Sequence, residues 1–305
     1  MHRPRPGPVR QVGPYSVITR LDATGPGTMP VPERRYVART ADGENTVLLS
    51  LPLDGTDPER FLVEARAAQI PLGPWAATVA DCSPSGSSPW YARAYEPVLP
   101  LPMVLAVHGG PLPEETLRVL GACLAETLVV VHAAGATHAG ISPAAVLLAD
   151  DGPRLTCHGA ARIAAPDGTD RSGLPGLEPG SLAPEQATGG RPRPPGDVYA
   201  LGAVLAYAAT GHTVPELREL PPFLRTLVPA CLARDPAARP RALDVLHALA
   251  PSPPDVIPSV SPSAIDPTVI DPGSRAFPLP GRVIAALARQ SAEVLAADLP
   301  LPTGS

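Results

Sequence analysis

The segment that most constrains the fold is residues 137–162, THAGISPAAVLLADDGPRLTCHGAAR. Residues 146–148 (Val-Leu-Leu) and 154–156 (Arg-Leu-Thr) alternate like strands, and the turn sequence Asp-Asp-Gly lies between them. This pattern predicts two short strands joined by a tight turn. A histidine lies near the start of the segment and Gly159 near its end, so we expect a loop, a hairpin and a second loop in direct succession.

A long amphipathic helix is predicted just before this segment, at residues 113–134. Leucine and valine recur there every three or four residues, and Pro113 and Gly135 suit its two ends. Earlier in the chain, short strands are predicted at residues 15–18, 35–39, 46–51, 76–79 and 90–95, with a helix at 56–68 capped by Asp57. The first third of the chain is therefore expected to be rich in strands.

The two loops resemble those of the bacterial eukaryotic-type Ser/Thr protein kinase family. The family's catalytic loop reads H-R-D-x-K-P-x-N, and here it reads H-A-G-I-S-P-A-A; the family's D-F-G reads C-H-G. Residues 183–185, 196–205 and 231–240 match the family's A-P-E, its D-V-W/Y-S-L-G helix and its closing C-L-x-x-D-P-x-x-R-P. The resemblance covers about residues 14–250. It implies an α+β, two-lobed protein-kinase-like fold with a small β-rich N-lobe and a larger helical C-lobe.

The resemblance and the composition together divide the chain into six parts. These are a disordered arm (1–13), the N-lobe (14–97), the C-lobe (98–250), a Pro/Ser-rich linker (251–280), an amphipathic helix (281–298) and a tail (299–305). Ile284, Leu287, Val294 and Leu295 share one side of the amphipathic helix. We expect this side to contact either the chain's own surface or another protein, and the residues leave both choices open.

Three predicted N-lobe positions bear on nucleotide binding. Ser50 stands where the family has the lysine that holds the nucleotide phosphates, and Glu64 matches the glutamate that pairs with that lysine. We expect Glu64 to be solvated or paired with Arg60 or Arg66. Arg93 falls near the position that closes the back of the nucleotide pocket, where it could enter that pocket or reach Glu64.

Four C-lobe positions have lost the side chains that the family uses for chemistry. Gly140 replaces the catalytic aspartate, and Ser142 replaces the lysine that stabilises the transferred phosphoryl group. Ala145 and Cys157 replace the asparagine and the aspartate that hold Mg²⁺, and a thiol is a poor ligand for a hard cation. We therefore assign no catalytic, cofactor-binding or metal-binding residue.

The positions that hold the family's C-lobe together are retained. The resemblance implies that Asp197 accepts hydrogen bonds from the catalytic-loop backbone and that Glu185 and Arg239 form a buried ion pair. His138 and Gly159 are also kept. Because structural residues remain where chemical ones are replaced, we interpret the chain as a pseudokinase.

Composition excludes several other classes of protein. All 24 basic residues are arginine, and a net charge of −5 does not suggest a nucleic-acid partner. The four cysteines are far apart, which disfavours a zinc site and a disulfide framework. We also expect no membrane span and no signal peptide, and hence a cytoplasmic location.

The predicted function is that of a catalytically inactive protein-kinase-like domain that acts as a binding or regulatory module. We expect a protein partner, no cofactor, and weak or absent nucleotide binding. The alternative is an atypical active Ser/Thr protein kinase that uses ATP and Mg²⁺ to phosphorylate protein hydroxyls. A thiol site at Cys157 and His158 is a third interpretation, disfavoured because adjacent residues of a strand point to opposite sides.

Overall fold

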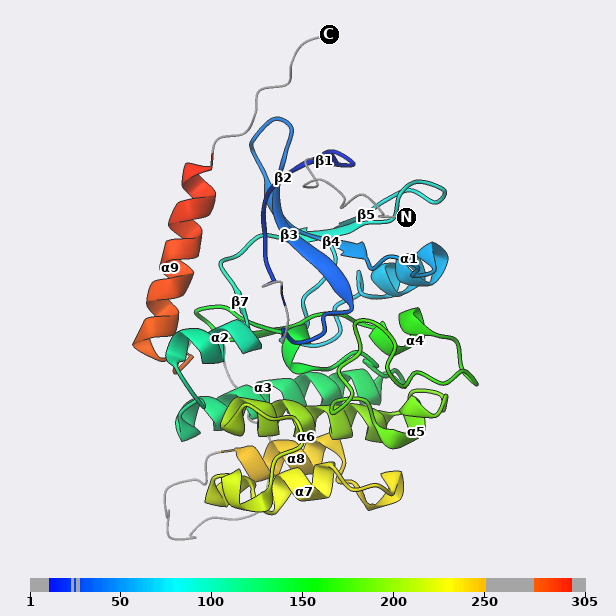
Figure 1. The fold of residues 1–305 in the computed structure, drawn as a ribbon, viewed down its shortest axis with the longest axis vertical. Coiled ribbons are helices and arrows are strands. Elements are labelled where there is room, and N and C mark those ends of the chain that lie inside the picture. Colours follow the sequence, from blue (N-terminus) through cyan, green and yellow to red (C-terminus); the bar gives the residue numbers. More distant parts are fainter. Residues whose placement is uncertain (1–10, 23–24, 26–27, 251–276, 298–305) are drawn as a thin grey trace, which may run out of the picture.

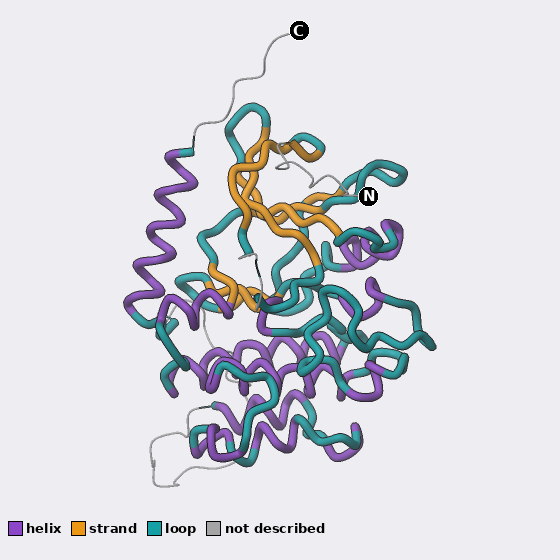
Figure 2. Tube along the Cα trace, in the orientation of Figure 1, coloured by secondary structure: helices purple, strands orange, loops and turns teal. Residues whose placement is uncertain are grey.

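The computed structural model describes residues 11–22, 25, 28–250 and 277–297. In Figure 1 a β-sheet lies above a mainly helical part, and Figure 2 shows the same division with strands in orange and helices in purple. This arrangement confirms the prediction of an α+β, two-lobed fold. Much of the predicted arm, linker and tail lies outside the described residues.

The N-lobe is built on a six-stranded sheet in which every neighbouring pair is antiparallel. In sheet order the strands are β1 (Gln11–Val12), β2 (Tyr15–Arg20), β3 (Glu33–Thr40), β4 (Thr46–Pro52), β6 (Tyr91–Ala94) and β5 (Asp81–Cys82). The register places Arg35 opposite Ser50, and Ser50 opposite Tyr91. Directly opposed residues share a face, so these three side chains form one row across the sheet.

Helix α1 (Pro58–Ala67) covers part of this sheet. The Asp57 side chain accepts hydrogen bonds from the first-turn amides, and Phe61 stacks on Tyr91 with ring centroids 5.3 Å apart. The strand predicted at residues 76–79 is wrong. Within that stretch only Ala76 forms an isolated bridge, and β5 begins two residues later, at Asp81.

The C-lobe core forms around α3 (Glu114–Ala133), which packs against α8 (Ala242–Leu249) and α6 (Pro194–Thr210). Among the described residues, α3 is one helix that is long and apolar enough to cross a membrane by length and composition alone. Its leucines face the neighbouring helices in this fold, and burial accounts for its apolar character. The remaining C-lobe helices are α2 (Leu101–His108), α4 (Ala160–Ala164), α5 (Pro184–Ala187) and α7 (Leu227–Cys231).

The hairpin predicted from the sequence lies between the lobes. It consists of β8 (Val146–Leu148) and β9 (Pro153–Leu155), so the second strand begins one residue earlier than predicted. A third short strand, β7 (Leu99–Pro100), pairs with β8. A short 3-10 helix, Pro143–Ala145, leads into the hairpin and connects it to the loop that begins at His138.

Helix α9 (Gly281–Ala296) docks on the same chain and spans both lobes, as Figure 1 shows at its left edge. The Gln290 amide makes two 2.8 Å hydrogen bonds with the backbone of Val98, between the lobes. Arg39 of β3 donates to the carbonyl oxygens of Val294 and Ala297, which ties the end of α9 to the sheet. In this structure, therefore, the helix contacts the surface of its own chain.

The buried face of α9 differs in part from the predicted one. Leu287 and Val294 are buried as expected, together with Val283. Ile284 and Leu295 are instead 50% and 78% exposed. A helical wheel could not make this distinction, because it shows which residues share a side of the helix but not how far that side is covered by the rest of the chain.

Candidate functional site

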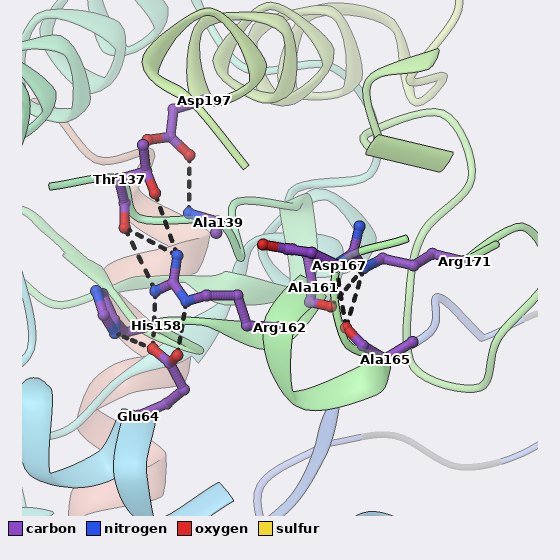
Figure 3. Close-up of polar contacts among 10 residues, drawn as sticks. All are labelled: Glu64, Thr137, Ala139, His158, Ala161, Arg162, Ala165, Asp167, Arg171 and Asp197. Carbon is purple, nitrogen blue, oxygen red and sulfur yellow. Dashed lines mark hydrogen bonds and ion pairs between the residues drawn. The ribbon is translucent and has the colours of Figure 1, made fainter. Parts of the chain in front are cut away.

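The loop that begins at His138 is held by hydrogen bonds to a buried carboxylate. Asp197 of α6 accepts bonds of 2.8 Å from the amides of His138 and Ala139, and Figure 3 shows the bond from Ala139. The ring of His132 lies 3.0 Å from the same side chain. The amide of Gly159 donates to the carbonyl of His138 at 2.8 Å. These bonds join both loops to the helical core, so their backbones are well positioned.

Gly140 stands where no side chain fits. A Cβ atom built on Gly140 would lie 1.9 Å from the carbonyl oxygen of Cys157, and 3.0 Å from the amide of Ala160. Both obstacles are backbone, so a side chain at this position would require the second loop to move. The space beside Gly140 is filled by the chain itself.

Ser142 and Ala145 serve the local structure. The Ser142 hydroxyl accepts a bond from the Ala145 amide at 3.3 Å and caps the 3-10 helix, and the Ala145 carbonyl accepts one from Thr156 at 2.8 Å. The side chain of Ala145 is fully buried. Ala145 therefore offers no polar side chain to a ligand, and the Ser142 hydroxyl serves as a cap.

Cys157 is a buried thiol with an unusual backbone angle, φ 60°. Its sulfur lies 3.6 Å from a carboxylate oxygen of Glu33. Burial, together with the nearby Glu33 charge, raises the pKa of Cys157 to about 12, so the thiol stays protonated at neutral pH. A protonated, buried thiol is a poor nucleophile, which removes the support for a thiol site at Cys157 and His158.

Ser50 belongs to a closed network of polar groups beneath the sheet. Its hydroxyl donates to Glu33 at 3.1 Å, and the Tyr91 hydroxyl donates to the other carboxylate oxygen of Glu33. Burial raises the pKa of Tyr91 well above its usual value, so the phenol remains a donor. Because Glu33 takes up both donors, Ser50 has no proton left to donate to a phosphate.

The positive charge next to Ser50 is supplied by Arg35 of the neighbouring strand, β3. Arg35, directly opposite Ser50, donates to Asp22 through two nitrogens, with Nε 2.9 Å from the carboxylate. A third nitrogen lies 3.3 Å from the Thr156 hydroxyl of the C-lobe. The side chains of Arg35 and Asp22 are 2% and 6% exposed. The cleft thus holds an ion pair of its own.

Glu64 pairs with the C-lobe. Arg162 of α4 donates to it through two nitrogens, at 2.6 and 2.7 Å, and the His158 ring lies 3.2 Å away (Figure 3). Burial alone would raise the pKa of Glu64, but Arg162 and His158 lower it to about 2. The expectation that Glu64 is solvated or paired with Arg60 or Arg66 is therefore wrong.

The glycine of the second loop is required by this ion pair. Gly159 has φ 74°, and a Cβ atom there would lie 2.2 Å from the Glu64 carboxylate. Arg93, by contrast, turns away from Glu64. It donates to the Ala77 carbonyl at 3.1 Å and lies 4.6 Å above the Tyr91 ring, which rules out the suggested contact with Glu64. Arg93 does line a cavity between the lobes, together with Leu48 and Leu147.

Apolar side chains of the two lobes also meet directly. Leu21, Val37 and Leu48 of the N-lobe belong to one buried cluster with Leu147 of β8 and Val294 of α9. Each of these side chains is at most 8% exposed. The apolar faces of the cleft are therefore packed against each other and against α9.

Glu185 and Arg239 lie together in the C-lobe. Nη1 and Nη2 of Arg239 donate to the Glu185 carboxylate at 2.7 and 2.8 Å. Nη1 also donates to the carbonyl of Pro195, and Nε donates to that of Ala233. The Arg239 side chain has no exposed area and that of Glu185 is 32% exposed. The guanidinium is thus fully used within the fold.

The chain is similar to several bacterial protein kinases. It is 35% identical over 266 residues to the probable serine/threonine-protein kinase PkwA of Thermomonospora curvata, and 34% identical over 264 residues to AfsK of Streptomyces coelicolor. These alignments cover 80% and 79% of this chain but only 35% and 32% of the relatives, so the chain spans about a third of their length. No family model matches the chain.

A solved structure decides the fold. The kinase domain of PknI from Mycobacterium tuberculosis superimposes with a TM-score of 0.60, at 19% identity, over 80% of this chain and 100% of that domain. The chain has the protein kinase fold. Its homologues are bacterial Ser/Thr protein kinases, so the resemblance seen in the sequence motifs is confirmed.

The expectation that this protein uses no cofactor is contradicted by its kinase relatives. Homologous protein kinases imply the use of ATP and Mg²⁺, and the kinase fold suggests a nucleotide site between the lobes. The same finding corrects the expectation of weak or absent nucleotide binding. ATP with Mg²⁺ is therefore the ligand to test in the cleft of this kinase-fold domain.

The side chains at the matching positions nevertheless do not fit a magnesium–phosphate group. Ala145 has only a methyl group, Cys157 is a protonated thiol, and Ser50 is bonded to Glu33. Among the residues that the structure describes, no cluster of three or more His, Cys, Asp or Glu side chains could hold a metal ion. Hard cations need such oxygen ligands.

Three features of this site were missed from the sequence. The Asp22–Arg35 pair lies outside the family's motifs. The signal that could have revealed it is that Glu33, Arg35 and Val37 share one face of β3, so two charged side chains lie beside a buried apolar one. Arg162 as the partner of Glu64 is 98 residues away, too far for a pattern to reveal. The buried Arg171, which donates to carbonyls of Ala161 and Ala165 (Figure 3), carries no motif.

Proposed function

We propose that this kinase-fold domain does not transfer phosphate and acts instead as a binding or regulatory module. The observation that carries the proposal is the position of the Cys157 carbonyl, which occupies the space that a side chain at Gly140 would need. In protein kinases the residue at this place orients and deprotonates the hydroxyl of the substrate. Here the backbone excludes such a residue.

The other working positions support the same conclusion. Phosphoryl transfer depends on positioning and on neutralising charge, and losing one such electrostatic group costs about 10² to 10³ in rate. Ser50, Ser142, Ala145 and Cys157 offer neither a cation nor a carboxylate, and three of them make or receive bonds within the fold. Arg35 supplies a cation, but Asp22 neutralises it.

Polar contacts between the lobes hold the domain in one shape. Glu64–Arg162 and Arg35–Thr156 connect the two lobes, and α9 bridges them from outside. A scaffold held in this way presents constant surfaces to a protein partner. We place its action in the cytoplasm, as the sequence suggests.

An atypical active Ser/Thr kinase is the second candidate, because the relatives are named as kinases. The two are separated by incubating the purified chain with γ-labelled ATP, Mg²⁺ or Mn²⁺, and a pool of Ser/Thr peptides. We expect no more label on the peptides, or on the chain, than in a heat-inactivated sample. Label that co-elutes with the folded protein and grows with time would establish the active kinase instead.

A further inference from the structure

A cleft of about 600 Å³ lies beside the ion pair of Glu64 and Arg162. Its walls come from α1, from the link between α3 and the first loop, from α4, and from residues 191–194, where α6 begins. The charged side chains that line it are Glu64, Asp167, Arg162, Arg191 and Arg193. This volume suits a side chain or small ligand.

The charges of this cleft do not cancel. Arg162 is paired with Glu64, and Asp167 is paired with the buried Arg171 at 3.0 Å. Arg191 and Arg193 are exposed, and neither forms an ion pair or donates a side-chain hydrogen bond to any residue for which coordinates are described. Two guanidinium groups therefore remain without a counter-charge in the cleft.

We infer that this cleft binds the phosphate of a phosphorylated serine or threonine on a partner protein. A phosphomonoester carries close to two negative charges at neutral pH, and arginine binds it through paired hydrogen bonds. Two free arginines match that charge. Pro192, Pro194 and Pro195 restrict the backbone on which both arginines stand, which reduces the conformational freedom lost on binding.

The phosphate is supplied by another chain. The nearby segment of this chain, residues 166–172, is held by Arg171, whose side chain has no exposed area. Arg171 donates to the carbonyls of Ala161, Ala165 and Gly190, so Thr169 and Ser172 lie on backbone that is fixed in place. A residue of a partner is free to enter the cleft. The inference rests on the proposed role as a binding module and names its class of partner.

The test uses the full chain and a fluorescein-labelled pool of short peptides with a central phosphothreonine. Binding is followed by fluorescence anisotropy, with the unphosphorylated pool in parallel. The variant Arg191→Ala/Arg193→Ala is compared with Arg218→Ala/Arg241→Ala, whose arginine side chains are 83% and 82% exposed elsewhere on the surface. Each arginine lost from the cleft should weaken phosphopeptide binding about tenfold or more, and the control pair should leave it unchanged.

Two results would overturn the inference. One is equal affinity for the phosphorylated and unphosphorylated pools; the other is an Arg191→Ala/Arg193→Ala variant that binds as well as the control variant. Inorganic phosphate should compete with the phosphopeptide in the unmodified protein, and failure to do so would also count against the site. Phosphate transfer is measured separately on the same sample, so inactivity and phosphopeptide binding can fail independently.

Discussion

The ion pair between Asp22 and Arg35 gives the sharpest prediction for stability. Both side chains are almost fully buried, at 6% and 2% exposed, beneath the N-lobe sheet. Replacing Asp22 by Asn would leave the buried Arg35 guanidinium without the carboxylate to which it is hydrogen-bonded. Breaking one side of a buried pair costs about 3 to 5 kcal/mol. Domains are typically stable by about 5 to 15 kcal/mol, so this loss would be a large fraction of the total.

Removing both charges should have a much smaller effect. The double variant Asp22→Leu/Arg35→Met replaces the pair by apolar groups of similar size, and such exchanges are often neutral or stabilising by about 1 to 4 kcal/mol. Thr156 loses the bond from Arg35 but still donates to Ala145 at 2.8 Å, so it is not left without a partner. The double variant should therefore be more stable than the single one.

Urea denaturation followed by tryptophan fluorescence measures these differences. Arg34→Ala is the matched control, because Arg34 is adjacent but pairs with Asp54 at the surface, where the side chains are 30% and 89% exposed. Such a pair contributes about 0 to 1 kcal/mol. If Asp22→Asn costs no more than Arg34→Ala, the pair is not buried as described. If the double variant is as unstable as Asp22→Asn, the reasoning about desolvation is wrong.

Three further predictions follow from other contacts. Arg239→Ala should lower the melting temperature far more than Arg193→Ala, because only Arg239 is bonded to Glu185 inside the fold; equal values would contradict the buried pair. The pKa of Glu64 is lowered to about 2 from 4.5, so its contribution to stability is present above pH 4.5 and is lost between 4.5 and about 2. The difference in unfolding free energy between wild type and Glu64→Gln should shrink in that range, and a difference that is independent of pH would refute the assignment. Leu287→Asp with Val294→Asp should make the amides of α9 exchange at the free-chain rate, whereas Ile284→Asp should not; equal protection in both would contradict the docked orientation.

The fold could be predicted because its signals are local and ordered. The motifs around Asp197, Glu185 and Arg239 have spacings that fit one arrangement of the C-lobe, and the structure places these residues in contact with the expected groups. The hairpin at residues 146–155 was recognisable from its turn and its apolar strands. Such features depend on neighbouring residues, so one sequence is enough to identify them.

The side-chain contacts between the lobes could not be predicted in the same way. Arg35 meets Thr156 across 121 residues, and Arg162 meets Glu64 across 98. No periodicity encodes such pairs, since each depends on how the lobes close. The docking of α9 is another example. Its amphipathic pattern indicated a contact, but Gln290, which bonds the Val98 backbone, was indistinguishable from a surface residue in the sequence.

The most direct test of the central claim is the rate of phosphate release from ATP with the protein in excess and Mg²⁺ present. This measurement needs no knowledge of a protein substrate, because it records transfer of the phosphoryl group to water, which requires only ATP and the protein. The kinase domain of AfsK, a relative 34% identical to this chain, is the positive reference. We predict a rate equal to that of ATP alone, since Gly140, Ala145 and Cys157 supply no group for the reaction. A first-order release that is proportional to the folded protein and absent after heat inactivation would contradict the account.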